Sequence, residues 1–245
     1  MKLLLILTLL LAHLFADTTK QDVTIGAGGY YQTQPYKGVD NLFLPSPVLF
    51  FDNGLFYVRW TQIGVYFLGQ NDGDTAWAFS LTAQPRIYGY KSSDIPGMAE
   101  RKNSFEGGLD FSAKRGDLHI ESMLVTDMLY KSKAWIFKTE AGYDFKIGNF
   151  SFYPTLILTY QSAQFTDYYY GVKRSEASPT KAEYRAKGGV QLGVQTYIEY
   201  PLSKDLSLFL NIKLDRLSHE ASKSPIVKDK HIYSGLASIL YHFEY

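Results

Sequence analysis

The C-terminal stretch YSGLASILYHFEY, residues 233–245, decides the fold of this 245-residue chain. As a strand it has an apolar, aromatic or small face made of Tyr233, Gly235, Ala237, Ile239, Tyr241, Phe243 and Tyr245, and a second face that carries Ser234, Ser238, His242 and Glu244. Soluble domains rarely end this way, because an exposed aromatic edge invites pairing with other chains. An outer-membrane barrel requires it, since its closing strand shows lipid an apolar side chain at every second position. The stretch therefore predicts an all-β fold, an antiparallel up-and-down transmembrane β-barrel.

The N-terminus has the pattern of a secretory signal peptide. Lys2 precedes an apolar run from Leu3 to Phe15, which ends at Ala16 before a polar stretch. The run is too short for a spanning helix, which needs roughly 20 residues. We therefore expect cleavage after Ala16 rather than a retained anchor, with residues 1–16 as the signal and 17–245 as the barrel domain. Later apolar stretches are shorter still, so strands must cross the membrane.

Composition narrows the function classes. Cleavage would reduce Lys and Arg from 25 to 24, against 24 Asp and Glu, so the mature chain has no formal net charge. A neutral chain is a poor partner for nucleic acid. With no cysteine, the chain has neither disulfides nor thiolate metal sites. The 20 Tyr, 16 Phe and 20 Gly occur in a chain of slightly negative mean hydropathy, which suits a barrel better than a helical membrane protein.

Four segments alternate strictly between apolar and polar residues: 135–147, 150–161, 190–200 and 206–216. Strands of about ten residues, tilted by roughly 40°, match the apolar band of about 25 Å on an outer-membrane barrel. A soluble up-and-down barrel of the lipocalin type is the alternative, because it also alternates but turns its apolar side chains into a ligand cavity. The 16% aromatic content and its concentration at strand ends favour membrane girdles.

Connections of alternating length support the same fold. Short turns are expected at 70–75, 115–117, 148–149 and 201–205, and long loops at 91–103, 130–133, 162–183 and 218–231. Outer-membrane barrels pair short periplasmic turns with longer outer loops in this way. Before residue 70, the segments 48–51, 55–60 and 63–68 are short for spanning strands. Three strands there give about twelve in total, and merging two of them gives ten.

Charged residues occupy the faces that should point into the barrel: Arg86, Glu106, Asp110, Lys138, Glu140, Asp144, Lys213 and Asp215. A barrel of ten to twelve strands has a narrow lumen, where unpaired charges are costly. We expect opposite charges to pair there and the interior to be occluded or very narrow. A minor conductance pathway is the alternative.

Short motifs follow one another in the C-terminal third: Tyr169-Tyr170-Gly171-Val172, Glu176-Ala177, Tyr184, Gly188-Gly189, Tyr200-Pro201-Leu202, Arg216-Leu217, Ala221 and Ser224-Pro225-Ile226-Val227, and then the aromatic terminus. Through these motifs the chain resembles the MltA-interacting protein (MipA/OmpV) family of outer-membrane proteins. The N-terminal half matches only in its general barrel pattern.

The resemblance implies a non-enzymatic outer-membrane barrel without a cofactor. In the member that names the family, such a barrel scaffolds murein machinery, as a bridge between a lytic transglycosylase and a penicillin-binding protein. Other members are osmoregulated or adhesive surface proteins, so a narrow small-solute channel or an adhesion protein is the alternative function. The expected partners also include outer-membrane lipid and the barrel-assembly machinery, for which Tyr241, Phe243 and Tyr245 would be the assembly signal.

Three adjacent tyrosines, Tyr168 to Tyr170, precede Gly171 at an expected junction between strand and loop. One interpretation is an interfacial aromatic belt with an irregular bend at the glycine. The other is that this loop folds inward with residues 224–227 and closes the outer mouth, because Ile226 and Val227 would otherwise be an apolar pair in a solvated loop.

An enzyme would need a catalytic constellation, and the candidates are few. Asp215, Ser218, His219 and Glu220 lie together in sequence near the outer rim. In an extended strand, Asp215 and His219 would be roughly 13 Å apart, which is too far for direct contact. We therefore interpret the cluster as solvated rim charges. His219 and His231 form a weak metal pair without a ligand-spacing motif.

Overall fold

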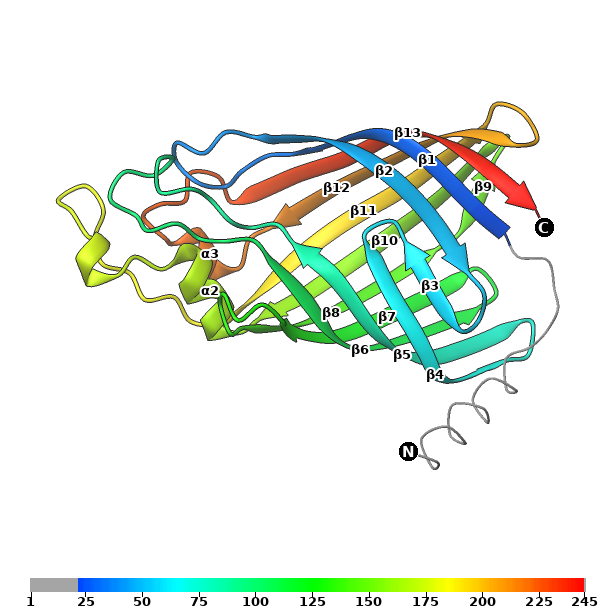
Figure 1. Ribbon diagram of the computed structural model, residues 1–245, viewed down its shortest axis with the longest axis horizontal. Helices are drawn as coiled ribbons and strands as arrows, with labels where there is room; N and C mark the ends of the chain where they lie inside the picture. The colour runs from blue at the N-terminus through cyan, green and yellow to red at the C-terminus, as the bar shows by residue number, and fades with distance from the viewer. Residues whose placement is uncertain (1–21, 245) are drawn as a thin grey trace.

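A computed structural model describes residues 22–244, which form a closed antiparallel β-barrel (Figure 1). The predicted signal peptide, residues 1–16, lies outside the described residues and stays a prediction. None of the helices in the described part of the chain is long and apolar enough to cross a membrane.

The strands and helices follow one another in a simple meander. The strands are β1 (Asp22–Gln32), β2 (Leu42–Asp52), β3 (Phe56–Arg59), β4 (Gln62–Asn71), β5 (Thr75–Arg86), β6 (Ser104–Arg115), β7 (Leu118–Asp127), β8 (Trp135–Tyr143), β9 (Phe145–Ile147), β10 (Phe150–Gln161), β11 (Gly189–Pro201), β12 (Leu206–Arg216) and β13 (His231–Glu244). The helices are α2 (Ala163–Tyr170), the 3-10 turn η1 (Arg174–Glu176) and α3 (His219–Ser222).

Across residues 22–244 the barrel has twelve strands, as the higher of the two expected counts predicted. β8 and β9 both pair with β10 and are interrupted only at Asp144, so they act as one strand. The wall closes where β1 pairs with β13, from Asp22 opposite Glu244 to Gln32 opposite Ser234. Closure leaves no free outer edges on the first and last strands, which is what allows a sheet to stand in lipid.

The apolar side chains of the alternating strands point outward. Leu156 is 68% exposed and Tyr143 is 50% exposed, whereas the intervening Thr155 and Thr159 are buried. A lipocalin-type barrel would show the reverse pattern. The soluble alternative is therefore wrong, and lipid contacts the outer face.

The N-terminal hairpins differ from the expected segments in one respect. β2 begins at Leu42, whereas the expected segment began at Val48. Pro45 and Pro47 interrupt the apolar alternation in the sequence, but they do not break the strand. Proline has no backbone N–H, so it fits in a strand at positions where no neighbouring strand would accept a hydrogen bond from that group. β3 has four residues, so the hairpin between β3 and β4 turns around Trp60 and Thr61, well short of the outer end.

Long connections gather at one end of the barrel and short turns at the other, as the alternation predicted (Figure 1). The long-loop end carries α2, η1 and α3, and the first and last strands reach the short-turn end. In outer-membrane barrels the long loops are extracellular and the short turns periplasmic. The two ends are accordingly called outer and periplasmic below.

Candidate functional site: a hollow lumen with a sealed outer mouth

The lumen holds a cavity of about 1730 Å³ that runs from the periplasmic turns to the outer loops. Its wall includes Asp52 to Gly54 at the periplasmic end and Tyr88 and Phe165 at the outer end. The expectation of an occluded or very narrow interior was therefore wrong in part. Within residues 22–244 the barrel is hollow, and a cluster of loop residues covers its outer mouth.

The structure places the predicted inward charges inside the barrel. Seven of them, Arg86, Glu106, Lys138, Glu140, Asp144, Lys213 and Asp215, line the cavity, and Asp110 is buried in the wall at 2% exposure. Six of them pair as expected: Arg86 with Glu106, Lys138 Nζ with Glu140 Oε1 at 2.8 Å, and Lys213 Nζ with Asp215 Oδ2 at 3.1 Å. Asp110 instead accepts a hydrogen bond from the Ser80 hydroxyl at 3.3 Å. Asp144 Oδ1 lies 3.2 Å from His119 Nδ1. Pairing of opposite charges offsets the cost of placing these groups in a confined lumen.

Sequence reasoning missed an apolar band inside the lumen. Val48, Phe209, Leu236 and Leu240 form a buried cluster on the inner face of β2, β12 and β13, in one part of the wall. The phenyl rings of Phe50 and Phe209 meet at 5.5 Å between centroids, in an edge-on arrangement. The signal was present in β13, where leucines alternate with serines on the inward face. The lumen is therefore amphipathic and not uniformly polar.

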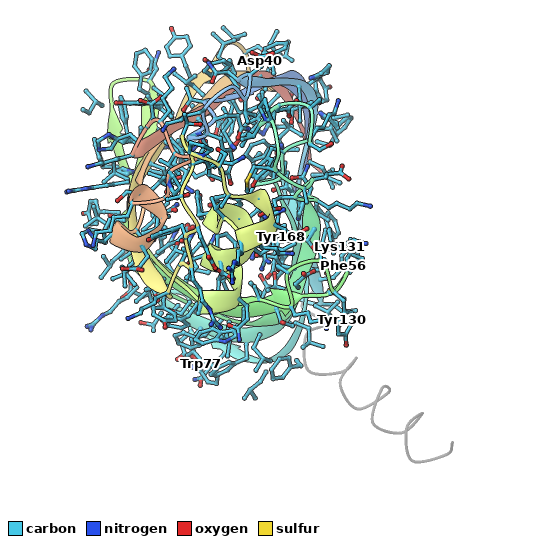
Figure 2. The ribbon with its side chains drawn as sticks, turned by 90° about the vertical axis from the view of Figure 1, so that its left-hand side faces the viewer. Asp40, Phe56, Trp77, Tyr130, Lys131 and Tyr168 are labelled. Carbon is cyan, nitrogen blue, oxygen red and sulfur yellow. The ribbon has the colours of Figure 1, made fainter. Side chains whose placement is uncertain are left out.

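The outer mouth is covered by a second apolar cluster, called the seal below, which takes residues from five connections and from neighbouring strands. These residues include Tyr36, Tyr90, Ile95, Met98, Phe165, Tyr169, Tyr170, Val172, Leu217, Ala221, Ile226 and Val227. Viewed from the outer end, α2 lies inside the ring of strands, with Tyr168 within the ring and Phe56 and Trp77 outside it (Figure 2). Burial raises the pKa of Tyr36 and Tyr170 well above the ordinary value, so their hydroxyls stay protonated.

The YYGV motif belongs to this seal. Tyr168 to Tyr170 form the last turn of α2, a helix that Ser162 caps by accepting a hydrogen bond from the Phe165 N–H at 3.4 Å. Tyr169 and Tyr170 are fully buried, so the aromatic-belt interpretation is wrong for both. The Ser224 hydroxyl donates to the Tyr170 carbonyl oxygen at 2.5 Å, and Ile226 is buried in the same cluster. This is the inward fold of the two loops that the alternative interpretation described.

A buried ion pair fastens the loops around the seal. Arg101 Nη2 donates to Glu176 Oε2 at 2.8 Å, and Arg101 Nε donates to the Tyr168 carbonyl oxygen at 2.6 Å. Burial alone would raise the pKa of Glu176. The hydrogen bond from Arg101, those from the backbone N–H groups of Lys173 and Ala99, and the charge of Arg101 outweigh it and lower the pKa to about 2. Glu176 belongs to the family motif, whereas Arg101 carried no sequence signal.

The other motif residues lie around the seal. Val172 pairs with Tyr184 in a short antiparallel bridge. Gly171 donates its N–H to the Asp167 carbonyl oxygen, and Gly189 packs against Ser218 so closely that a Cβ would overlap it. Gly188, Arg216 and Pro225 lie at strand ends or in the last loop, and Ala177 follows η1. Of the assembly-signal residues, Tyr241 is exposed on β13, Phe243 is partly buried and Tyr245 lies outside the described residues.

The rim cluster does not assemble catalytic chemistry. Asp215 points into the lumen and pairs with Lys213, whereas the Ser218 hydroxyl caps α3 by accepting from the Ala221 N–H at 3.2 Å. The Glu220 side chain accepts from the Lys187 N–H. Within residues 22–244, no group of three or more His, Cys, Asp or Glu side chains is placed to hold a metal ion.

Comparison with known proteins agrees with this architecture. The family model described as MltA-interacting protein MipA matches residues 25–243. A putative outer membrane protein of Escherichia coli (strain K12), YiaT, is 25% identical and covers 93% of this chain and 94% of its own. The outer membrane protein Omp26La of Vibrio anguillarum is 28% identical over 75% of this chain and 72% of its own.

A third relative carries the name of the family. The MltA-interacting protein of Escherichia coli (strain K12) is 25% identical and covers 90% of each chain. The matched region includes all twelve strands and the loops of the seal. The chain therefore belongs to the MltA-interacting protein MipA family, and it is an outer-membrane β-barrel protein.

Proposed function

We propose that this protein is a non-enzymatic outer-membrane barrel whose periplasmic rim docks peptidoglycan enzymes, a lytic transglycosylase first and a penicillin-binding protein with it. The sealed outer mouth carries the proposal, because a barrel without an open pore acts through its exposed ends. A relative named MltA-interacting protein aligns over 90% of each chain, which supports the transglycosylase as the first partner.

The periplasmic rim consists of tight turns that are held by their own hydrogen bonds. Asn53 Oδ1 accepts from the N–H groups of Leu55 and Phe56, and the Gly73 N–H donates to Asn71 Oδ1 at 2.9 Å. The Gly116 N–H donates to the Asp74 carbonyl oxygen, which links two neighbouring turns. Turns fixed in this way lose little conformational entropy when a partner binds.

The small size of each turn sets a condition on the partner. A stable interface buries about 800 Å² on each side, which one turn cannot supply. A docked enzyme must therefore contact several turns at once, including those around Asp72 and Lys204. Lys204 is 88% exposed on its side chain and is free to reach a partner.

Site-specific photo-crosslinking in cells tests the proposal. A photoreactive residue at Asp72 or at Lys204 should capture a lytic transglycosylase. The matched control is Lys228, a similarly exposed lysine in the outer loop before β13, which should capture none. Recovery of no transglycosylase from either rim position, or equal recovery from Lys228, would contradict docking at the rim.

A small-solute conduit is the second candidate, and the hollow lumen favours it. On this hypothesis the seal acts as a gate, and deletion of residues 168–181 should raise the single-channel conductance in planar bilayers. Unchanged conductance after the deletion argues against the gate. Conductance by the intact protein, together with failed crosslinking at the rim, would favour the conduit over the scaffold.

A further inference from the structure

The sheet has a gap in its strand pairing above the hairpin formed by β3 and β4, called the window below. β2 pairs with β3 only from Phe50 to Asp52, and β5 pairs with β4 only as far as Ala83. Within the described residues, positions 42–48 of β2 and 84–86 of β5 therefore have no strand partner on the sides that face each other. Figure 1 shows β3 and β4 ending between β2 and β5, well before the outer loops.

Prolines occupy both edges of the window. The Trp60 N–H donates to the Leu49 carbonyl oxygen at 2.9 Å, so odd-numbered residues of β2 turn their backbone groups toward the window. Pro45 and Pro47 are among these residues. The same reasoning applies to β5, where the Asp72 N–H donates to the Thr75 carbonyl oxygen and Pro85 has the same parity. Of the four backbone nitrogens that face the window, those of Phe43, Pro45, Pro47 and Pro85, the three proline nitrogens therefore lack a hydrogen.

An edge built with proline resists pairing, because a further strand finds few donors there. The window is thus encoded in the sequence on both of its sides. It is also bounded above and below: the Tyr36 hydroxyl donates to the Tyr88 carbonyl oxygen at 2.9 Å on the outer side, and Trp60 forms the lower boundary. The Trp60 indole N–H donates to the Ser46 hydroxyl at 2.9 Å, and its ring lies 5.4 Å from that of Tyr30.

Residues of the window lie between the lumen and the apolar outer face. The cavity wall includes residues from both edges and from the lower boundary, namely Leu44, Pro45, Ser46, Trp60, Gln62, Gln84, Pro85 and Tyr88. On the outside, Phe43 is 68% exposed beside one edge and Ile63 is 47% exposed on the hairpin below. These side chains belong to the apolar outer face, so the window opens at membrane depth. Irregular backbone is tolerated at that depth only where it lines a cavity.

The chemistry of the window selects a class of ligand. At Pro45, Pro47 and Pro85 its edges present carbonyl oxygens without a matching N–H, which suits a ligand that donates hydrogen bonds. Gln32 and Gln84 add uncharged amides, and the nearby Arg86 is already paired with Glu106. Tyr30, Trp60 and Phe165 supply aromatic surface for an apolar body. A charged ligand would meet no free counter-charge among these groups.

We propose that the window is a lateral port through which a neutral amphiphile passes between the membrane and the lumen. The ligand has an apolar body and a hydroxyl, amine or amide donor. This route does not use the sealed outer mouth, and it is independent of the proposed docking of enzymes at the rim.

The tryptophans and the lack of cysteine permit a direct test. Of the three tryptophans, Trp60 and Trp77 both border the cavity, and Trp135 is exposed on the outer face. In a W77F/W135F background, Trp60 is the single donor for energy transfer. The probe is N-phenyl-1-naphthylamine, an uncharged aromatic amine, titrated into the protein in lipid nanodiscs. We expect saturable quenching of Trp60 emission.

A chemical block identifies the route without affecting folding. Leu44→Cys places a thiol at the window, and a bulky maleimide is attached only after the protein has folded. Labelling should weaken probe binding at least about tenfold, which corresponds to 1.4 kcal/mol. The matched control is the same label on Leu192→Cys, a lipid-facing position on β11, which should leave binding unchanged.

Three outcomes would overturn the port. One is the absence of saturable quenching in the unlabelled protein. Another is equal binding with and without the label at position 44. The third is binding that is blocked only by a label on Lys114→Cys at the periplasmic end of the cavity, which would assign entry to that end.

Discussion

The ion pair between Arg101 and Glu176 should control how firmly the seal stays closed, and Arg101→Ala tests this. The two side chains are 4% and 6% exposed. Removal of one partner of a buried pair costs about 3–5 kcal/mol, because the other charge is left uncompensated. Glu176 keeps the backbone N–H groups of Lys173 and Ala99, so we expect the lower value, about 3 kcal/mol. The population of undocked loops should then rise by about a hundredfold.

Amide hydrogen exchange measures this population. The Val172 N–H donates to the Tyr184 carbonyl oxygen at 2.8 Å, and the Tyr184 N–H donates back at 2.9 Å. Local opening of the loops exposes both amides. In Arg101→Ala, their protection should fall by about a hundredfold. Lys91→Ala, an exposed lysine in the same loop as Arg101, is the control and should leave protection unchanged. Equal protection in the two variants would refute the reasoning.

Three further predictions concern the pH response, the outer face and the packing of the wall. The pKa of Glu176 is about 2 in the folded protein against 4.5 unperturbed. The stability that ionised Glu176 gives to the docked loops is therefore complete above pH 4.5 and is lost as the pH falls toward 2. Amide protection in the loops should drop over that range, and in Glu176→Gln it should not change with pH. Leu156→Arg should destabilise the barrel by about 2–4 kcal/mol in urea titrations in lipid, and the neighbouring lumen-facing Thr155→Arg by clearly less; equal costs would contradict the assignment of faces. Gly108→Ala should cost about 1–3 kcal/mol in the same titration, because the added methyl overlaps the Leu124 carbonyl oxygen on β7, and an unchanged midpoint would refute that account.

Period-two alternation predicted the barrel because its physical cause is local: successive side chains of a strand point to lipid and to the lumen in turn. The same rule failed at β2, where Pro45 and Pro47 interrupt the apolar pattern. Because proline has a low propensity for strands, such a segment is predicted to be a loop. β2 forms an edge of the window only because its neighbour β3 is short. The sequence of β2 alone does not show how far β3 pairs with it.

The seal could be predicted only in part, because it depends on contacts between distant loops. Ile226 and Val227 gave a signal, as apolar residues in a loop that should be solvated. Tyr36 and Arg101 gave none, since their partners come from other connections. The hollow lumen was missed for a related reason: charge pairing along the wall satisfies the polar groups without filling the space between them.

The origin of the seal in five separate loops also orders events during biogenesis. Its last contributors, Leu217, Ile226 and Val227, lie between β12 and β13, so the outer mouth cannot shut until the final hairpin has crossed the membrane. We therefore expect a partly inserted chain to lack a complete seal. Transient permeability to small antibiotics in cells with slowed barrel insertion would reveal how long that unfinished state survives.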